Sequence, residues 1–241
     1  MANGIYIGMS GAIAAQRRLD VVANNVANAS TPGFRQQRAQ FTAFVVPTGD
    51  ARPIEKGFVA MTQTAVDDSA GTISASENPL DVAIDGRGYF VVQAPGEQLL
   101  TRAGNFRLAE DGRLVDTLGN SVLGGEGGAR SPIVVRPDAG PVSVGGDGTV
   151  SQGGTAIARL SIVDVAANRL VPVGDTHLRA APTDMQPMPN ARVQAGALES
   201  SNVNPVRGLV ELVTLTREFE SSHKVMGEYR RLDQKLLGSN R

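Results

Sequence analysis

The sequence contains no cysteine, which excludes disulfide bonds, thiolate metal sites and cysteine nucleophiles. It also lacks tryptophan, and its 241 residues include only seven phenylalanines and three tyrosines. This scarcity of aromatic side chains argues against a surface that stacks on sugar rings. Glycine and proline are plentiful, at 28 and 13 residues, so we expect many turns and a chain that is not helical throughout.

Positive and negative charges are nearly balanced, because the sequence has 23 Lys and Arg and 24 Asp and Glu, for a net charge of −1. Such a balance creates no field that would attract nucleic acid, and we expect no nucleic-acid partner. Apolar runs stay well below the roughly 18 residues of a membrane span, so we expect no membrane insertion. The first residues lack a basic region and are interrupted by Gly8 and Ser10, which predicts that any export does not use a Sec-type signal.

Motifs for catalysis or metal binding are also missing. His177 and His223 lie far apart without HExxH spacing, and we expect them to be solvated or packed helix residues. No GK[ST] motif exists to hold a phosphate. Asp81 and Asp85 lack the oxygen-rich loop of a calcium site, and we interpret the Asp85-Gly86 pair as a turn. The sequence therefore predicts no enzyme, no cofactor and no metal.

Two long helices are predicted, one near each end of the chain. Heptad spacing of apolar residues indicates a helix over about residues 3–29, ended by a type II turn at Pro32-Gly33. A second helix is expected from the Asn204-Pro205 cap to about Gly238, with Gly208 softening its start. The first helix is predicted to pair through rows formed by Ile5, Ala12, Leu19 and Val26 and by Met9, Gln16 and Ala23. The row of the second is Leu212, Leu215, Phe219, Ser222, Met226, Tyr229, Asp233 and Leu236.

Apolar residues of the first helix also lie outside these rows, among them Ile13 and Val22. The two helices could simply pair with each other inside one globular molecule. A helix that is apolar on more than one side is also what an assembled tube of subunits would cover, and exposed apolar surface marks interaction sites.

Between the helices the period of the pattern changes to two. Asp111-Gly112 and Asp147-Gly148 lie between apolar runs and predict two tight hairpins. Strands are also expected at 88–93 and 158–165, and prolines at 182–189 indicate a stiff polar connection. The predicted fold is mainly β with long terminal α-helices, that is, a discontinuous coiled-coil domain of both ends and a central β-rich domain. We expect the paired helices at 1–40 and 197–241, an extended connector at 41–80, and the β-rich domain with its returning linker at 81–196.

Four segments, in this order, resemble the motifs of the flagellar basal-body rod and hook family: residues 24–35, 78–92, 101–124 and 198–226. The resemblance covers nearly the whole chain and is greatest to the proximal rod type, with the distal type as the alternative. The first motif maps onto Asn24, Asn25, Asn28, Thr31, Pro32, Gly33 and Phe34.

The resemblance implies a structural axial subunit of the basal-body rod, which crosses the periplasm and passes torque from motor to hook. It implies export through the flagellar type III apparatus, and contacts with copies of itself and with other proximal and distal rod proteins. The assembly interface would be formed by Ile5, Met9, Ala12, Leu19, Val26, Leu212, Leu215, Phe219, Met226, Tyr229 and Leu236. A second reading from another class is a β-domain that binds a surface polymer and is dimerised by its helices.

Overall fold

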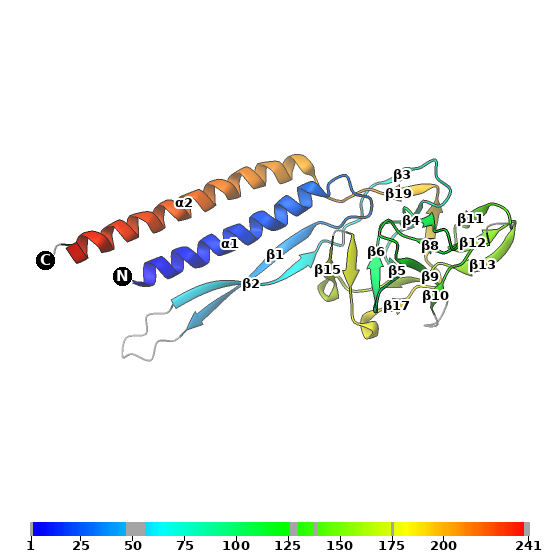
Figure 1. Ribbon diagram of the computed structural model, residues 1–241, viewed down its shortest axis with the longest axis horizontal. Helices are drawn as coiled ribbons and strands as arrows, with labels where there is room; N and C mark the ends of the chain where they lie inside the picture. Colours follow the sequence, from blue (N-terminus) through cyan, green and yellow to red (C-terminus); the bar gives the residue numbers. More distant parts are fainter. Residues whose placement is uncertain (1, 47–55, 126–129, 137–138, 175, 239–241) are drawn as a thin grey trace. The chain divides into compact units, whose positions relative to one another are not determined.

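The computed structural model describes residues 2–46, 56–125, 130–136, 139–174 and 176–238. The chain divides into two compact units. Unit 1 comprises Met1–Ala27, Gln37–Ala65 and Asn204–Arg241, and unit 2 comprises Asn28–Gln36 and Val66–Val203. The described part of the chain is mainly β, with one long helix near each end, as the sequence predicted (Figure 1).

Unit 1 contains helices α1 (Ala2–Ala27) and α2 (Pro205–Gly238) and a two-stranded sheet of β1 (Gln37–Val46) and β2 (Lys56–Val66). The helices run side by side in opposite directions (Figure 1). At the start of α2, Asn204 Oδ1 accepts a hydrogen bond of 3.0 Å from the Arg207 backbone N–H, with Pro205 in the first turn, so the predicted cap is confirmed. Neither helix, over its described residues, combines the length and hydropathy that crossing a bilayer requires.

The β1–β2 pair differs from the extended connector expected at 41–80, because β1 contacts α1 and groups with the helices. Residues 28–36 and 197–203 also lie elsewhere than expected. They form part of unit 2 instead of the helical unit. The physical reason is their hydrogen bonding and burial: Phe34 is fully buried, and the Gly33 N–H donates to the Glu199 carbonyl at 2.7 Å.

Unit 2 is built on an antiparallel sheet in the order β15-β16-β6-β5-β9-β8-β7, with β10 paired to β9, and with β14 paired to both β5 and β17. Smaller sheets are β11-β12-β13, β18-β4 and β19-β3. The strands of unit 2 are β3 (Ile73–Ala75), β4 (Val82–Asp85), β5 (Tyr89–Ala94), β6 (Glu97–Thr101), β7 (Arg107–Leu108), β8 (Leu114–Val115), β9 (Ser121–Gly124), β10 (Ser131–Pro132), β11 (Val142–Val144), β12 (Thr149–Gln152), β13 (Thr155–Arg159), β14 (Ile162–Asp164), β15 (Val171–Val173), β16 (His177–Arg179), β17 (Gln186–Pro187), β18 (Arg192–Ala195) and β19 (Ala197–Glu199). Single 3₁₀ turns are η1 (Ala167–Arg169) and η2 (Pro182–Asp184).

Strand β5 explains the core of unit 2, because alternate side chains of a strand point to opposite faces. Phe90 and Val92 enter one apolar cluster, and Tyr89 and Val91 enter another. The first cluster is organised by an edge-to-face contact of Phe90 with Phe106, whose ring centroids are 5.1 Å apart. Both faces of the sheet are therefore covered, which accounts for the uninterrupted apolar run in this strand.

Both predicted Asp-Gly hairpins are confirmed, between β7 and β8 and between β11 and β12. Gly112 and Gly148 occupy them with φ of +78° and +83°, a region that favours glycine. The type II turn is also confirmed, since the Phe34 N–H donates to the Thr31 carbonyl at 3.3 Å and Gly33 has φ of +70°.

Three local expectations were wrong. The strand expected at 158–165 is interrupted, with β13 and β14 pairing to different neighbours. The proline-rich 182–189 segment is more than a connection, because it contains η2 and also β17, which pairs with β14. His177 is neither solvated nor helical but is buried in β16.

Candidate assembly interface

The inner face of α1 is a row of small and aliphatic side chains spaced alternately four and three residues apart. Ala12, Ala15 and Val22 are buried, and Gly8, Leu19 and Val26 are half-buried. Ala12, Leu19 and Val26 of the first predicted row therefore lie on the buried side of α1, and Val26 lies against Gly208 of α2. Met9, by contrast, is 47% exposed and lies beside this row. The second predicted row, at positions 9, 16 and 23, is therefore shifted by one residue from the observed positions 8, 15 and 22.

The inner face of α2 follows the predicted row over its described side chains. Leu215 and Met226 are buried, and Leu212 and Phe219 are half-buried. The Phe219 ring also meets the His223 ring edge-to-face at 4.5 Å. Ile5 lies within α1, and Tyr229 and Leu236 lie within α2, but their side chains are outside the described residues.

Two glycines set the register of the helix pair. A Cβ on Gly8 would lie 3.0 Å from Met226 Cγ, and a Cβ on Gly208 would lie 2.6 Å from Val26 Cγ2. Gly208 thus allows close approach of the two helices, and it lies inside α2, which begins at Pro205 as the cap predicted. An ion pair of Arg18 with Glu218, at 3.8 Å, fits the same antiparallel register. Both side chains are about half exposed, so the pair contributes little stability.

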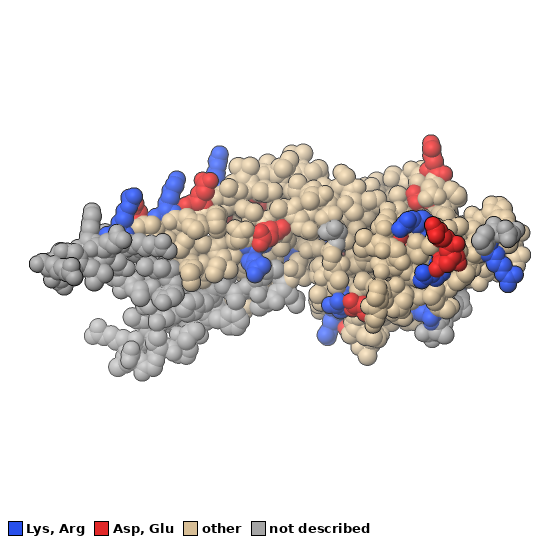
Figure 2. Space-filling view, viewed as in Figure 1, with Lys and Arg blue, Asp and Glu red and all other residues tan. Residues whose placement is uncertain are grey.

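A second apolar surface, which we call the outer stripe, covers the opposite side of the first turns of α2. It consists of Val206, Leu209, Val210 and Val213, whose exposed fractions range from 54% to 70%. On the face shown in Figure 2, the surface over the beginning of α2 is free of charged side chains, which project farther along the helix. On α1, Met9 and Ile13 are similarly exposed, at 47% and 54%.

Sequence reasoning missed the outer stripe because it looked for a single row in α2. The signal was present in the spacing i, i+3, i+4 and i+7 from Val206, which places four apolar residues on one helix face. A helix with one apolar face toward its partner and another toward solvent has more apolar surface than this chain alone covers. Such a surface indicates an interaction site.

Within unit 1, the first family motif fastens β1 to the end of α1. The buried Asn25 side chain donates to the Gln37 carbonyl and accepts from the Gln37 N–H, both at 2.8 Å. This pair of bonds mimics a strand partner and starts β1 directly after the turn. Asn24 is half-buried in the same helical turn.

Within unit 2, the rest of the motif forms a tight turn on the β-sheet. Asn28 Oδ1 accepts from the Thr31 hydroxyl at 3.0 Å, and Pro32 precedes Gly33 in the turn. A Cβ on Gly33 would lie 2.1 Å from the Ala103 backbone nitrogen, so no other residue fits there. The adjacent Phe34 ring is fully buried. These motif residues shape the junction of the chain and carry no catalytic arrangement.

A buried His–Asp pair lies apart from the motif, in the sheet of unit 2. His177 Nε2 lies 2.7 Å from Asp116 Oδ2. Because an ionised carboxylate only accepts, the proton of this bond belongs to Nε2. Asp116 also accepts from the backbone N–H groups of Leu118 and Asn120 and from the Asn120 amide. Burial alone would raise the pKa of Asp116, but the bonds from His177 and Asn120 outweigh it and the pKa is lowered.

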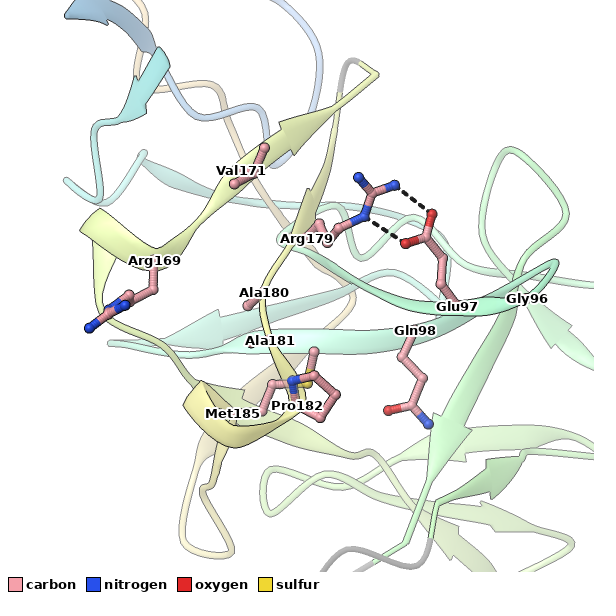
Figure 3. A pocket seen from close by; sticks show the side chains of 10 residues that line it. All are labelled: Gly96, Glu97, Gln98, Arg169, Val171, Arg179, Ala180, Ala181, Pro182 and Met185. Carbon is pink, nitrogen blue, oxygen red and sulfur yellow. Dashed lines mark hydrogen bonds and ion pairs between the residues drawn. The ribbon is translucent and has the colours of Figure 1, made fainter. Parts of the chain in front are cut away.

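Unit 2 also has an open groove of about 560 Å³ beside β6, β15 and β16 (Figure 3). At its rim Arg179 donates to both carboxylate oxygens of Glu97, at 2.6 and 2.7 Å, and these bonds lower the pKa of Glu97. Its apolar part includes Val171, Pro182 and Met185, and no aromatic ring is among the described lining residues. Among the described residues, no cluster of three or more His, Asp or Glu could hold a metal ion.

Comparison with known proteins finds three family models that match successive parts of the chain. The family model described as "Flagella basal body rod protein" matches residues 5–35. "Flagellar hook protein FlgE/F/G D1 domain" matches 83–152, and "Flagellar basal body rod FlgEFG protein C-terminal" matches 194–239. The matches thus cover α1 with the motif turn, much of unit 2, and α2.

Relatives match over almost the whole chain. "Flagellar basal-body rod protein FlgF" of Caulobacter vibrioides is 35% identical, covering 94% of this chain and 93% of the relative. The FlgF protein of Salmonella typhimurium is 31% identical with the same coverage of 94% and 93%. "Flagellar basal-body rod protein FlgG" of Bacillus subtilis is 33% identical over the full length of both chains. The chain therefore belongs to the flagellar basal-body rod protein family.

Proposed function

We propose that the protein is an axial subunit of the proximal flagellar rod that assembles through its terminal helices into a hollow shaft. The observation that carries this proposal is the two-sided apolar character of α2. Its inner face packs on α1, and the outer stripe stays exposed in the single chain. Neighbouring subunits that cover the outer stripe would gain about 25 cal/mol for each Å² of apolar surface buried, offset by the ordering of the helices.

In the assembled rod the paired helices form a coiled coil. The interface comprises the outer stripe and the predicted residues of both helices, which are Ile5, Met9, Ala12, Leu19 and Val26 of α1 and Leu212, Leu215, Phe219, Met226, Tyr229 and Leu236 of α2. Subunits contact copies of themselves and other proximal and distal rod proteins. The rod crosses the periplasm and transmits torque from motor to hook, and the subunit reaches it through the flagellar type III export apparatus. The family consists of structural proteins, and the chain is not an enzyme.

Placement in the proximal part of the rod is supported by the relatives named FlgF, at 31–35% identity. A distal position is the alternative, supported by the FlgG relative that matches over its full length. The groove of unit 2 gives little support to a polymer-binding module, because its described lining offers no aromatic ring for a sugar.

The test is electron microscopy of basal bodies from a strain with the gene deleted in frame, together with a swimming assay. We expect short rods and loss of motility, restored by the full chain but not by a chain lacking residues 203–241. The point at which the rods stop separates a proximal from a distal position. Complete rods and normal swimming would refute an axial role.

A point variant tests the helix row without removing a segment. Phe219→Asp places a charge on the inner face of α2, where Phe219 is half-buried. We expect unit 2 to stay folded while the variant fails to enter rods. Normal basal bodies that contain the variant would exclude this row from the assembly interface.

A further inference from the structure

The chain passes four times between its two units, at residues 27/28, 36/37, 65/66 and 203/204. On the side of unit 2, these four passages belong to only three segments, 28–36, 66–72 and 199–203. All three segments are part of unit 2, so their mutual contacts are defined within one compact body. The contacts among these three segments decide whether each segment can unfold separately or only together with the other two.

Hydrogen bonds join each of these segments to the other two. The Asp67 N–H donates to the Gln36 carbonyl at 2.8 Å, and the Gln36 N–H donates to Asn202 Oδ1 at 2.7 Å. The Asn202 amide in turn donates to the carbonyls of Asp67 and Ser69, at 3.1 and 2.9 Å. A Cβ on Gly71 would lie 1.8 Å from the Ser200 carbonyl oxygen, which shows how closely the segments approach.

A buried charge cluster lies among the same segments, centred on Glu199. Its carboxylate is 2.9 Å from Arg35 Nη1 and 3.4 Å from Arg102 Nε, and each of the three side chains is only 2–3% exposed. Glu199 Oε1 also accepts from the Gly71 N–H at 2.8 Å. Arg35 donates to the Ser69 carbonyl. One carboxylate therefore contacts the first and second segments while it belongs to the third.

The body of unit 2 holds the cluster through Arg102, at the end of β6. Arg102 donates to the Gly86 carbonyl, and its guanidinium carbon lies 5.6 Å from the centroid of the Tyr89 ring. The Tyr89 hydroxyl donates to Asp68 Oδ1 at 2.5 Å, which ties in the second segment again. Burial, followed by the bond to Asp68, raises the pKa of Tyr89, so the hydroxyl keeps its proton at neutral pH.

Stability alone does not account for this cluster. Within the described part of the chain, Arg35 Nε and Nη2 and Arg102 Nη1 are buried without a hydrogen-bond acceptor. Apolar side chains of similar size often stabilise a core as well as or better than a buried ion pair, whereas removing one partner leaves an uncompensated charge. In this cluster, moving any one of the three segments away from the others would leave a buried charge without its partner, which favours a single arrangement of the segments.

We propose that Arg35, Glu199 and Arg102 form a clamp that makes the three segments at the four chain passages unfold and refold together. A force that reaches unit 2 through any one passage is then shared by all of them. This mechanical consequence rests on the proposed rod function, whereas the clamp itself is a property of the isolated chain. The three side chains act by holding backbone segments in place.

Hydrogen exchange of the purified full-length chain tests the clamp. The variant Glu199→Gln keeps the size of the side chain but leaves two buried guanidinium groups without a counter-charge. We expect exchange to become at least about tenfold faster, and together, at the clamp amides, while the core amides are unchanged. The clamp amides are those of Gly33, Gln36, Asp67, Gly71, Ser200 and Asn202, and the core amides are those of Val91, Leu114 and Ile133.

Glu97→Gln is the matched control, because Glu97 belongs to the exposed ion pair with Arg179 in the same unit. This variant should leave the exchange rates of the clamp amides and of the core amides unchanged. Three outcomes would overturn the clamp. In the first, Glu199→Gln accelerates exchange equally at clamp and core amides, so the cluster stabilises the whole unit and not the segments in particular. In the second, only Gly33 and Gly71, which bond Glu199 itself, exchange faster, and in the third no amide does.

Should Glu199→Gln fail to fold, Arg35→Lys provides the same readout. Arg35 Nη1 contacts both the Ser69 carbonyl and the Glu199 carboxylate. Lysine keeps the charge, but its shorter side chain does not place the ammonium nitrogen where Nη1 lies, so the clamp amides should again accelerate as a group. Because exchange is measured on the unassembled chain, a negative result refutes the clamp whether or not the protein is a rod subunit. A failed deletion and complementation experiment would refute the rod function without affecting the exchange result.

Discussion

Gly208 is the residue at which helix propensity and packing make opposite demands. Alanine there would favour the helix by up to about 1 kcal/mol. Its Cβ, however, would lie 2.6 Å from Val26 Cγ2, and overpacking typically costs about 1–3 kcal/mol. We expect Gly208→Ala to lower the melting temperature of the helical signal. Gly227→Ala is the control in the same helix, since its Cβ would meet no atom within 4 Å, and it should raise that temperature. A stabilised Gly208→Ala would contradict the close approach.

The sequence predicted that Gly208 softens its helix because propensity is all that a single position reveals. The reason for the glycine is Val26, which is far away in sequence and reaches it only through the antiparallel register. The role of Gly33 could be predicted from the sequence, because the adjacent Pro32 and Gly33 are themselves the signal for the turn. His177 could not be predicted as buried, since its partner Asp116 lies on a different strand connection.

The His177–Asp116 pair predicts how unit 2 responds to acid. The pKa of Asp116 is lowered in the folded state, so the unfolded chain binds the proton more readily. The stabilisation by this carboxylate is therefore complete above its unfolded pKa of about 3.9 and is lost as the pH falls through the lower folded value. Asp116→Asn should be less stable than the wild type at pH 7, and the difference should shrink below about pH 4. Denaturant unfolding at several pH values measures it, and a difference independent of pH would argue against an ionised Asp116.

At the scale of elements, the outer stripe of α2 should matter for assembly and not for folding. Val210 is 63% exposed, so Val210→Glu should change the stability of the single chain by no more than about 0.5 kcal/mol. In an assembled rod the same carboxylate would be buried without a partner, at a cost of several kcal/mol. We expect a folded chain that cannot restore swimming to a deletion strain. Ser221→Glu, at another exposed position of α2, should restore it. Normal motility with Val210→Glu would exclude the stripe from the interface.

Elements with local signals were predicted well, and those that depend on distant partners were not. The Asn204-Pro205 cap and both Asp-Gly hairpins follow from neighbouring residues and are confirmed. The second row of α1 was placed one residue too far along, because its true members include Gly8 and Ala15, which carry almost no hydrophobic signal. The pairing of β17 with β14 could not be foreseen, since proline-rich sequence predicts a connection and only the partner strand makes it part of a sheet.

For the whole molecule, the two units should differ in stability. The described inner faces of the helix pair bury mostly small side chains, with Leu215 and Met226 as the large ones. Unit 2 buries Phe34, Tyr89, Phe90 and Phe106, and both faces of its sheet are covered by apolar clusters. Since burial of apolar area dominates stability, the helices should melt at a lower temperature than the β-unit.

Calorimetry combined with circular dichroism at 222 nm measures this difference. We expect two transitions, of which the first coincides with the loss of helical signal and is the one that Gly208→Ala lowers. A single transition seen equally by both methods would contradict independent units. Helices that are only marginally stable in the free subunit would present a complete outer stripe only rarely, which slows association in solution. At the tip of a growing rod, neighbouring subunits would stabilise the same helices by binding them, so that assembly is favoured there and not elsewhere.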